Sequence, residues 1–343
     1  MNMQQAIARL AESADINSEE MRAVMRLVMG GDATPSQIGA FLVALRIKGE
    51  TIDEIAAATE VMRELATPVH VNAEHLVDMA GTGGDGSNLF NVSTASCFVV
   101  AAAGGHVAKH GNRGVSSSSG SSDVLEALGV KLDLTPEQVA RCIEEVGMGF
   151  MFAPAHHAAM KHAAGPRREL CLRTLFNMLG PMTNPAGVKR QLVGVFDPAL
   201  CRPMAEVLKR LGSEHVMVVH AEEGLDEISS AGPTRVVELR EGTIAEYDIT
   251  PTEFGRPLTS IEDLRVSDSA ESLALIRAAL KGDNAEAANI VVMNAGAAIY
   301  VSGAAATLAD GIQMADDALA SGLARQKVTE LAQFTELAQA SNA

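Results

Sequence analysis

Short apolar runs alternate with helical patterns along most of the chain after Pro68, and this alternation constrains the fold more than any other feature. It is typical of βαβ units and predicts a mainly parallel sheet, whose ligands bind in the loops after the carboxyl ends of strands. Two further runs, 236–239 and 244–249, lie close together and predict an antiparallel hairpin. The alternating runs cover residues 75–80, 99–103, 106–110, 150–153, 191–196 and 215–220.

The first 66 residues carry helical patterns and little else. Asn17, Thr34 and Thr51 each precede such a pattern and have Glu or Gln three positions on, which predicts capped helix starts. A chain of 343 residues has room for about two domains. We predict a small helical domain over residues 1–68, serving as a cover or in dimerisation, and a larger α/β domain over residues 69–343.

Charge and composition limit the partners. Lys and Arg number 27 against 43 Asp and Glu, the net charge is −16, and aromatic residues make up 3%. Nucleic acids and anionic membranes need a surplus of cations, and single strands need stacking side chains, so we predict neither partner. The four cysteines form no CxxC pair and the start shows no signal peptide, which favours free thiols in the cytoplasm. The uncharged run 290–309 breaks into a strand, a turn and a helix, which argues against a membrane span.

A glycine-rich loop, residues 81–86, follows the first predicted strand. Glycines let backbone amides approach phosphate oxygens, although the loop matches neither the dinucleotide pattern nor the P-loop. A flexible turn remains an alternative. Residues 91–95 then supply polar caps at the start of an apolar helix, and the amides of a helix start would form a second anion site.

A second loop, residues 109–114, gathers Lys109, His110, Asn112 and Arg113 and runs into the serine-rich stretch 116–122. A point charge, a guanidinium fork, hydroxyls and amides are the donors that a polyphosphate needs. Alternatively, the charges of a solvated loop pair with nearby acids.

Carboxylate and arginine side chains are the remaining candidate ligand-binding groups. Asp226 and Glu227 follow the strand 215–220 and are the minimal ligands of a Mg²⁺ ion, although adjacent acids are also common on so acidic a surface. Arg167 could hold a carboxylate through a bidentate fork, whereas Arg168 beside Glu169 fits a salt-bridged helix surface better. The histidines at 156, 157 and 162 lack the spacing of a zinc site.

Together and in this order, these motifs resemble those of the anthranilate phosphoribosyltransferase family of the tryptophan pathway. The resemblance runs over essentially the whole chain, and its specificity comes from the order, because each motif is weak alone. The segments that carry it are residue 37 with 48–51, then 81–85, 90–94, 109–113, 120–126, 173–181, 184–185 and 226–227.

The resemblance implies a helical domain joined to an α/β domain like that of nucleoside phosphorylases, usually in a homodimer. It implies transfer of the phosphoribosyl group from phosphoribosyl pyrophosphate to the amine of anthranilate, with Mg²⁺. The metal would be held by Ser93, Asp226 and Glu227, and anthranilate by Gly81, His110, Asn112 and Arg167. Phosphoribosyl pyrophosphate would contact Gly81, Gly84, Asp85, Leu89, Asn91, Val92, Ser93, Thr94, Lys109, His110, Gly111, Asn112, Arg113, Gly114, Val115, Ser116, Ser117 and Ser121.

The sequence departs from the family at a few positions. Leu89 replaces the usual Thr and removes a hydroxyl, Ser118 and Ser122 replace commoner Lys and Ala, and Cys171 stands where Gly is frequent. The chemistry needs no strong base, because an aromatic amine is already a neutral nucleophile at pH 7. We therefore expect His110 to shape or polarise the anthranilate pocket.

Two rival functions were weighed. Pyrimidine nucleoside phosphorylases share the two-domain fold but carry a Lys-His-Ser-Thr-Gly-Gly loop, which differs from residues 109–114. A related branch that binds nucleic acid would need a basic face, which this acidic chain does not predict.

Overall fold

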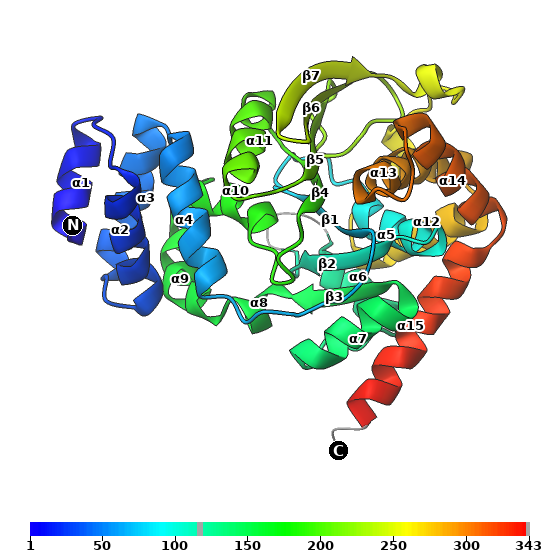
Figure 1. Cartoon of the computed structure of the whole chain (residues 1–343), viewed down its shortest axis with the longest axis horizontal. Coiled ribbons are helices and arrows are strands. Elements are labelled where there is room, and N and C mark those ends of the chain that lie inside the picture. The colour runs from blue at the N-terminus through cyan, green and yellow to red at the C-terminus, as the bar shows by residue number, and fades with distance from the viewer. Residues whose placement is uncertain (115–118, 341–343) are drawn as a thin grey trace.

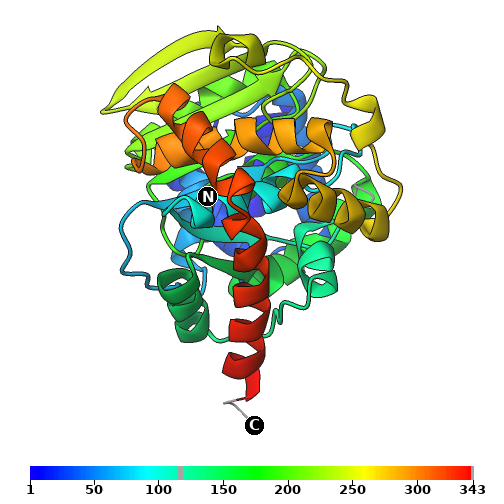
Figure 2. The same cartoon turned by 90° about the vertical axis from the view of Figure 1, so that its right-hand side faces the viewer.

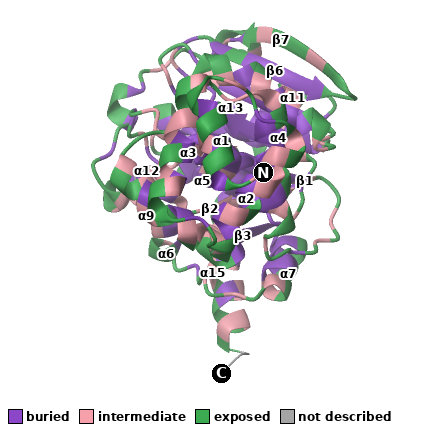
Figure 3. Cartoon of the chain, turned by 90° about the vertical axis from the view of Figure 1, so that its left-hand side faces the viewer, coloured by how far each residue is buried: buried purple, intermediate pink, exposed green. Residues whose placement is uncertain are grey.

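The computed structural model describes residues 1–114 and 119–340. The chain begins with four helices that form a layer at one end of the molecule (Figure 1). Figure 3 views this layer from outside, with exposed residues on its outer surface and buried strands behind it. The helices are α1 (Met3–Ala11), α2 (Ser18–Gly30), α3 (Pro35–Lys48) and α4 (Ile52–Glu64).

The predicted helix caps are confirmed. The side chains of Asn17, Thr34 and Thr51 each accept a hydrogen bond from the backbone amide three residues on, and the Glu or Gln side chain there accepts one from the backbone amide of the cap residue. Gly49 ends α3 with φ of 87°, a conformation that side chains disfavour. Local sequence alone therefore sets where these helices begin and end.

A seven-stranded sheet with the order β3-β2-β1-β4-β5-β6-β7 forms the centre of the molecule. The strands β3, β2, β1, β4 and β5 run parallel to one another. β6 is antiparallel to both of its neighbours, β5 and β7. The predicted parallel sheet and the predicted hairpin are both confirmed. The strands are β1 (Leu76–Gly81), β2 (His106–Gly111), β3 (Met148–Phe152), β4 (Arg190–Gly194), β5 (His215–Ala221), β6 (Thr234–Arg240) and β7 (Thr243–Ile249).

Helices cover both faces of the sheet. One face packs on a group of mainly C-terminal helices, visible together in Figure 2. These are α5 (Val92–Ala102), α12 (Ser269–Lys281), α13 (Ala285–Ser302), α14 (Leu308–Ala320) and α15 (Leu323–Ala340). α6 (Ser121–Ala127) packs on α12, and α7 (Pro136–Val146) lies beside β3.

The other face joins the N-terminal helices in a second core. Val193, Val216 and Val237 of the sheet share this core with Phe41 of α3 and Met62 of α4. The helical layer is thus built from two distant stretches of chain. Its second stretch contains α8 (Ala153–His156), α9 (Lys161–Leu170), α10 (Leu175–Met182) and α11 (Cys201–Arg210). Short 3₁₀ turns connect elements at Ala158–Met160, Pro198–Leu200, Pro251–Phe254 and Glu262–Leu264.

Two apolar runs expected as strands are helices, so those predictions are wrong. Residues 99–103 lie at the end of α5, and the start of the uncharged run 290–309 belongs to α13. α13 is buried on all sides, and such a helix shows no amphipathic period, which makes it resemble a buried strand in sequence. Within residues 1–114 and 119–340, no helix is long and apolar enough to cross a membrane.

Candidate active site at the carboxyl edge of the sheet

The loops singled out in the sequence meet at one edge of the sheet. β1, β4 and β5 are parallel neighbours and end at Gly81, Gly194 and Ala221, so the segments that follow them emerge side by side. The amide of Gly83 donates to Oδ2 of Asp226 at 2.7 Å, although 143 residues separate them. The glycine-rich loop and the paired carboxylates are therefore in direct contact.

The carboxylates of Asp226 and Glu227 lie half-buried at this edge. Burial, and then the negative charge of Asp85, raises the pKa of Asp226 to about 6. Burial, and then the charge of Asp226, raises the pKa of Glu227 to about 8. Two desolvated carboxylates that resist joint ionisation could hold a divalent cation in place of protons.

Lys109 brings a buried cation to the same carboxylates. Its side chain leaves β2 toward α5, where Nζ donates to the Met79 carbonyl at 2.9 Å and to Oγ of Ser93 at 3.2 Å. The amide of Ser93 donates in turn to Oε1 of Glu227 at 3.2 Å. Lys109, Ser93 and Glu227 thus form a chain of contacts from the end of β2 to the carboxylates.

The glycine-rich loop turns sharply after β1. Gly83 and Gly84 have φ values of 64° and 73°, which favour glycine. Asp85 accepts hydrogen bonds from both the amide and Oγ of Ser87, so its carboxylate stabilises the loop itself. The loop is held in a defined conformation, which does not support the alternative of a flexible turn.

The start of α5 is not capped by a polar side chain as the sequence predicted. Asn91 occupies the N-cap position, but its side chain does not cap the helix and instead accepts from Oγ of Ser272 at 2.7 Å. Val92 and Thr94 are buried in the first turn, and only Ser93 among these residues reaches the carboxylates. Leu89 packs partly buried against the core and pairs with Arg265 in an isolated bridge.

The second loop continues β2 beyond Gly111 and folds back on α6. Arg113 pairs with Glu126 at 2.6 Å and with Asp123 at 3.1 Å, which is the alternative anticipated for charges on a solvated loop. The backbone carbonyl of Asn112 accepts from Oγ of Ser121 at 3.5 Å, and the amide of Gly114 donates to Asp123. Of the predicted phosphoribosyl contacts, Val115, Ser116 and Ser117 lie outside the described residues.

The imidazole of His110 lies on the face of β2 opposite to that of Lys109. Successive side chains of a strand point to opposite faces, so His110 faces away from Lys109, toward α8. Nδ1 of His110 lies 3.5 Å from Oδ2 of Asp78, and its ring lies 6.1 Å from that of His157. Burial lowers the pKa of His157 to about 4, so this second imidazole is neutral at pH 7.

Arg167 lies on α9, after the segment that contains His157. Its guanidinium stands 5.3 Å from the ring centroid of Phe176, and burial lowers its pKa. Within the described parts of the chain it forms no ion pair, so its charge is free to meet an anion. Arg168 is exposed, and the salt bridge expected with Glu169 is not formed there.

The sequence analysis missed three residues of this edge. Gly194 allows the Asp226 backbone to pass, since a Cβ at position 194 would overlap the Asp226 carbonyl oxygen. Asp78 is a fully buried carboxylate inside an apolar strand, and that isolated charge was a readable signal. Arg173 stacks on Phe196 at 3.9 Å and approaches Gly84, a contact that no local pattern announces.

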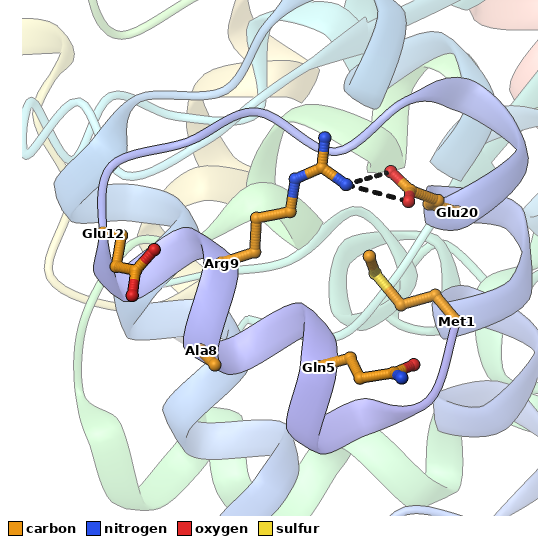
Figure 4. Close-up of a pocket in the computed structure, with 6 residues that line it drawn as sticks. All are labelled: Met1, Gln5, Ala8, Arg9, Glu12 and Glu20. Atoms are coloured by element: carbon orange, nitrogen blue, oxygen red, sulfur yellow. Dashed lines mark hydrogen bonds and ion pairs between the residues drawn. The ribbon is translucent and has the colours of Figure 1, made fainter.

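Cavities elsewhere lack this combination of groups. Figure 4 shows one of about 610 Å³ beside α1 and α2, where Arg9 pairs with Glu20 at 2.9 Å. A second, of about 520 Å³, lies at the amino edge of the sheet near His215 and Tyr300. Neither contains residues of the three loops that meet at the carboxyl edge.

The fold is that of a glycosyl transferase. Residues 73–325 match the α/β domain of a glycosyl transferase family, and residues 4–66 match its helical bundle domain. The chain is 65% identical to the anthranilate phosphoribosyltransferase of Cellvibrio japonicus, over 99% of this chain and all of the relative. It is 63% identical to that of Teredinibacter turnerae, over 98% of this chain and all of the relative.

Solved structures agree. The anthranilate phosphoribosyltransferase of Thermus thermophilus superposes with a TM-score of 0.91 at 43% identity, over 96% of this chain and 99% of the other. The Saccharomyces cerevisiae enzyme, solved with phosphoribosyl pyrophosphate and Mg, shares the fold with a TM-score of 0.88 at 24% identity, over 97% and 98%. The chain belongs to the anthranilate phosphoribosyltransferase family and has that activity in tryptophan biosynthesis.

Proposed function

We propose that the carboxyl edge of the sheet binds phosphoribosyl pyrophosphate and Mg²⁺ on the Lys109 side and anthranilate on the His110 side. The observation that carries this proposal is the linked set of contacts from Gly83 to Asp226 and from Lys109 through Ser93 to Glu227. The solved Saccharomyces cerevisiae enzymes bind phosphoribosyl pyrophosphate with Mg, and 4-fluoroanthranilate, which supports the two ligand classes.

Asp226, Glu227 and Ser93 are the proposed metal ligands. Their oxygens suit Mg²⁺, which takes few carboxylates and completes its shell with water and phosphate. The raised pKa values of Asp226 and Glu227 support this assignment, because burial and then neighbouring negative charge raise them, and a cation would offset both. When bound, the metal would offset negative charge on the pyrophosphate.

The phosphoribosyl group would be held mainly by the loops. Amides of the turn Gly81 to Asp85 would approach phosphate oxygens, and Lys109 would supply a point charge from within the sheet. Asn112 and Ser121, whose backbone and side chain meet, would complete the enclosure. The Leu89 side chain offers no hydrogen-bonding group, so it would contribute packing only.

Anthranilate would lie between Arg167 and the end of β2. Its carboxylate would accept a bidentate pair of hydrogen bonds from the unpaired guanidinium, and His110, Asn112 and Gly81 would line the amine side. The contact of His110 with His157 supports this placement, since His157 precedes the helix that carries Arg167.

Catalysis would then rest on position and charge. Departure of pyrophosphate leaves an oxocarbenium-like sugar, and Lys109 stabilises the leaving negative charge in a water-poor setting. The amine attacks as a neutral nucleophile held in line, and the cationic nitrogen that forms with the new C–N bond loses its acidic proton to solvent or to the departing pyrophosphate. No residue has to act as a strong base.

The Mg²⁺ dependence of Asp226→Asn tests the metal assignment. Turnover is followed through the loss of anthranilate fluorescence, with a metal-free control. Loss of one carboxylate ligand should raise the Mg²⁺ concentration for half-maximal activity at least tenfold. The control is Glu222→Gln, an exposed acid in the same loop. Equal Mg²⁺ dependence in the two variants would contradict the assignment.

We further propose that the protein is a cytoplasmic homodimer in which residues 1–68 provide the interface. The four cysteines are free thiols in the structure, which suits a reducing compartment. Ile47 at the end of α3 is 78% exposed, an apolar side chain available to a second copy. Analytical ultracentrifugation of the wild type and of Ile47→Glu measures the assembly directly, and a monomeric wild type would contradict it.

A further inference from the structure

Buried polar atoms without hydrogen-bond partners cluster at and around the His110 side chain. Among the described residues, both carboxylate oxygens of Asp78, Nδ1 of His110 and Nε2 of His157 are buried and unpartnered. Leaving such groups unpaired in a protein interior costs about 1–3 kcal/mol each. A cluster of them at the edge of a ligand site therefore needs a functional reason.

Asp78 lies where it can act on His110. β1 and β2 are parallel neighbours, and Oδ2 of Asp78 stands 3.5 Å from Nδ1 of His110. This is longer than an optimal hydrogen bond, and such contacts often tighten only when the site is filled. The Asp78 carboxylate is fully buried. Lys109, which directly precedes His110 in the sequence, points to the other face of the sheet, toward Ser93.

We propose that Asp78 is a positioning residue that accepts the Nδ1–H of His110 and so leaves Nε2 of His110 as an acceptor for the amine of anthranilate. This rests on the placement of His110 in the anthranilate pocket proposed above. An imidazole bonded through Nδ1–H to a carboxylate has a fixed tautomer and ring orientation.

The first measurement uses the unaltered enzyme. ¹⁵N chemical shifts of labelled histidine report which ring nitrogen carries the proton, and the missing signal in His110→Ala assigns the residue. We expect His110 to be protonated at Nδ1, and a neutral His110 protonated at Nε2 would overturn the proposal. This measurement requires no substituted carboxylate to fold.

The kinetic test uses Asp78→Asn. We expect kcat/KM for anthranilate to fall about tenfold to a hundredfold, the range of a hydrogen bond to a charged group, with KM for phosphoribosyl pyrophosphate unchanged. In the His110→Ala background the same substitution should have no further effect, because Asp78 acts through His110. Additive losses would overturn the positioning role.

A matched control exists at the opposite edge of the sheet. Glu238 is a buried carboxylate whose Oε1 lies 2.7 Å from Nε2 of His215. Glu238→Gln makes the same chemical change and should leave the anthranilate kinetics unaltered; equal losses in the two variants would show a structural effect and overturn the proposal. If His110→Ala itself leaves those kinetics unchanged, the pocket assignment fails, whereas a loss in His110→Ala without one in Asp78→Asn refutes only the role of Asp78.

Discussion

Gly194→Ala should disable the proposed metal site without replacing any of its proposed ligands. A Cβ at position 194 would lie at less than half the ordinary contact distance of 3.4 Å from the Asp226 carbonyl oxygen. The position of the Cβ is fixed by the backbone of β4, and the atom that it meets is a backbone carbonyl oxygen, so no side chain can rotate away. The segment with Asp226 and Glu227 must therefore retreat by about 2 Å, because interiors are close-packed.

The expected loss follows from that displacement. A shift of about 1 Å in a reacting group costs roughly a hundredfold in rate, so we expect turnover at saturating substrates to fall at least a hundredfold. Overpacking should also destabilise the fold by about 1–3 kcal/mol. Anthranilate fluorescence measures the rate over a series of Mg²⁺ concentrations, and thermal melting measures the stability.

Gly39→Ala is the matched control. A Cβ at this position in α3 would meet no atom within 4 Å, so the substitution should stabilise the helix by about 0.5–1 kcal/mol and leave the Mg²⁺ response unchanged. If Gly194→Ala keeps the wild-type rate and Mg²⁺ dependence, the close approach does not position the carboxylates and the reasoning is refuted.

Two further predictions concern charge at the same edge. Because the pKa of Glu227 is raised to about 8, its protonated form stabilises the metal-free protein below the ordinary pKa of a glutamic acid, and this stability is lost as pH rises toward 8. In EDTA, the melting temperature should therefore fall between pH 5 and pH 8 less in Glu227→Gln than in the wild type; equal falls would contradict the raised pKa. Arg167→Ala should raise KM for anthranilate about 30- to 100-fold with little change for phosphoribosyl pyrophosphate, because a charged bidentate contact is lost. The exposed Arg168→Ala is its control, and the opposite pattern in steady-state kinetics would reverse the pocket assignment.

Local patterns were enough for most of the fold. The capping residues Asn17, Thr34 and Thr51 fixed helix starts because a cap involves atoms only three residues apart. The alternation after Pro68 predicted the parallel sheet because each apolar run reflects burial of its own strand. The start of α13 was wrongly predicted as a strand, because burial on every side erases the period that distinguishes a helix from a strand.

The candidate site was readable as residue types but not as geometry. Lys109, Asp226 and Glu227 could be named from their chemistry, and the resemblance to a family ordered them. Arg113 shows the limit, since its pairing with Asp123 and Glu126 depends on how the loop folds onto α6, which no local pattern encodes.

The sequence by itself determined which segments become helices and strands and which side chains could meet phosphate, carboxylate and metal. The tertiary structure alone decided that β1 lies between β2 and β4, because strand order depends on packing among distant segments. That order brings the backbone of Asp226 against Gly194 and the carboxylate of Asp78 beneath His110. Each of these two contacts joins residues 32 positions apart in the chain, and no local period encodes them.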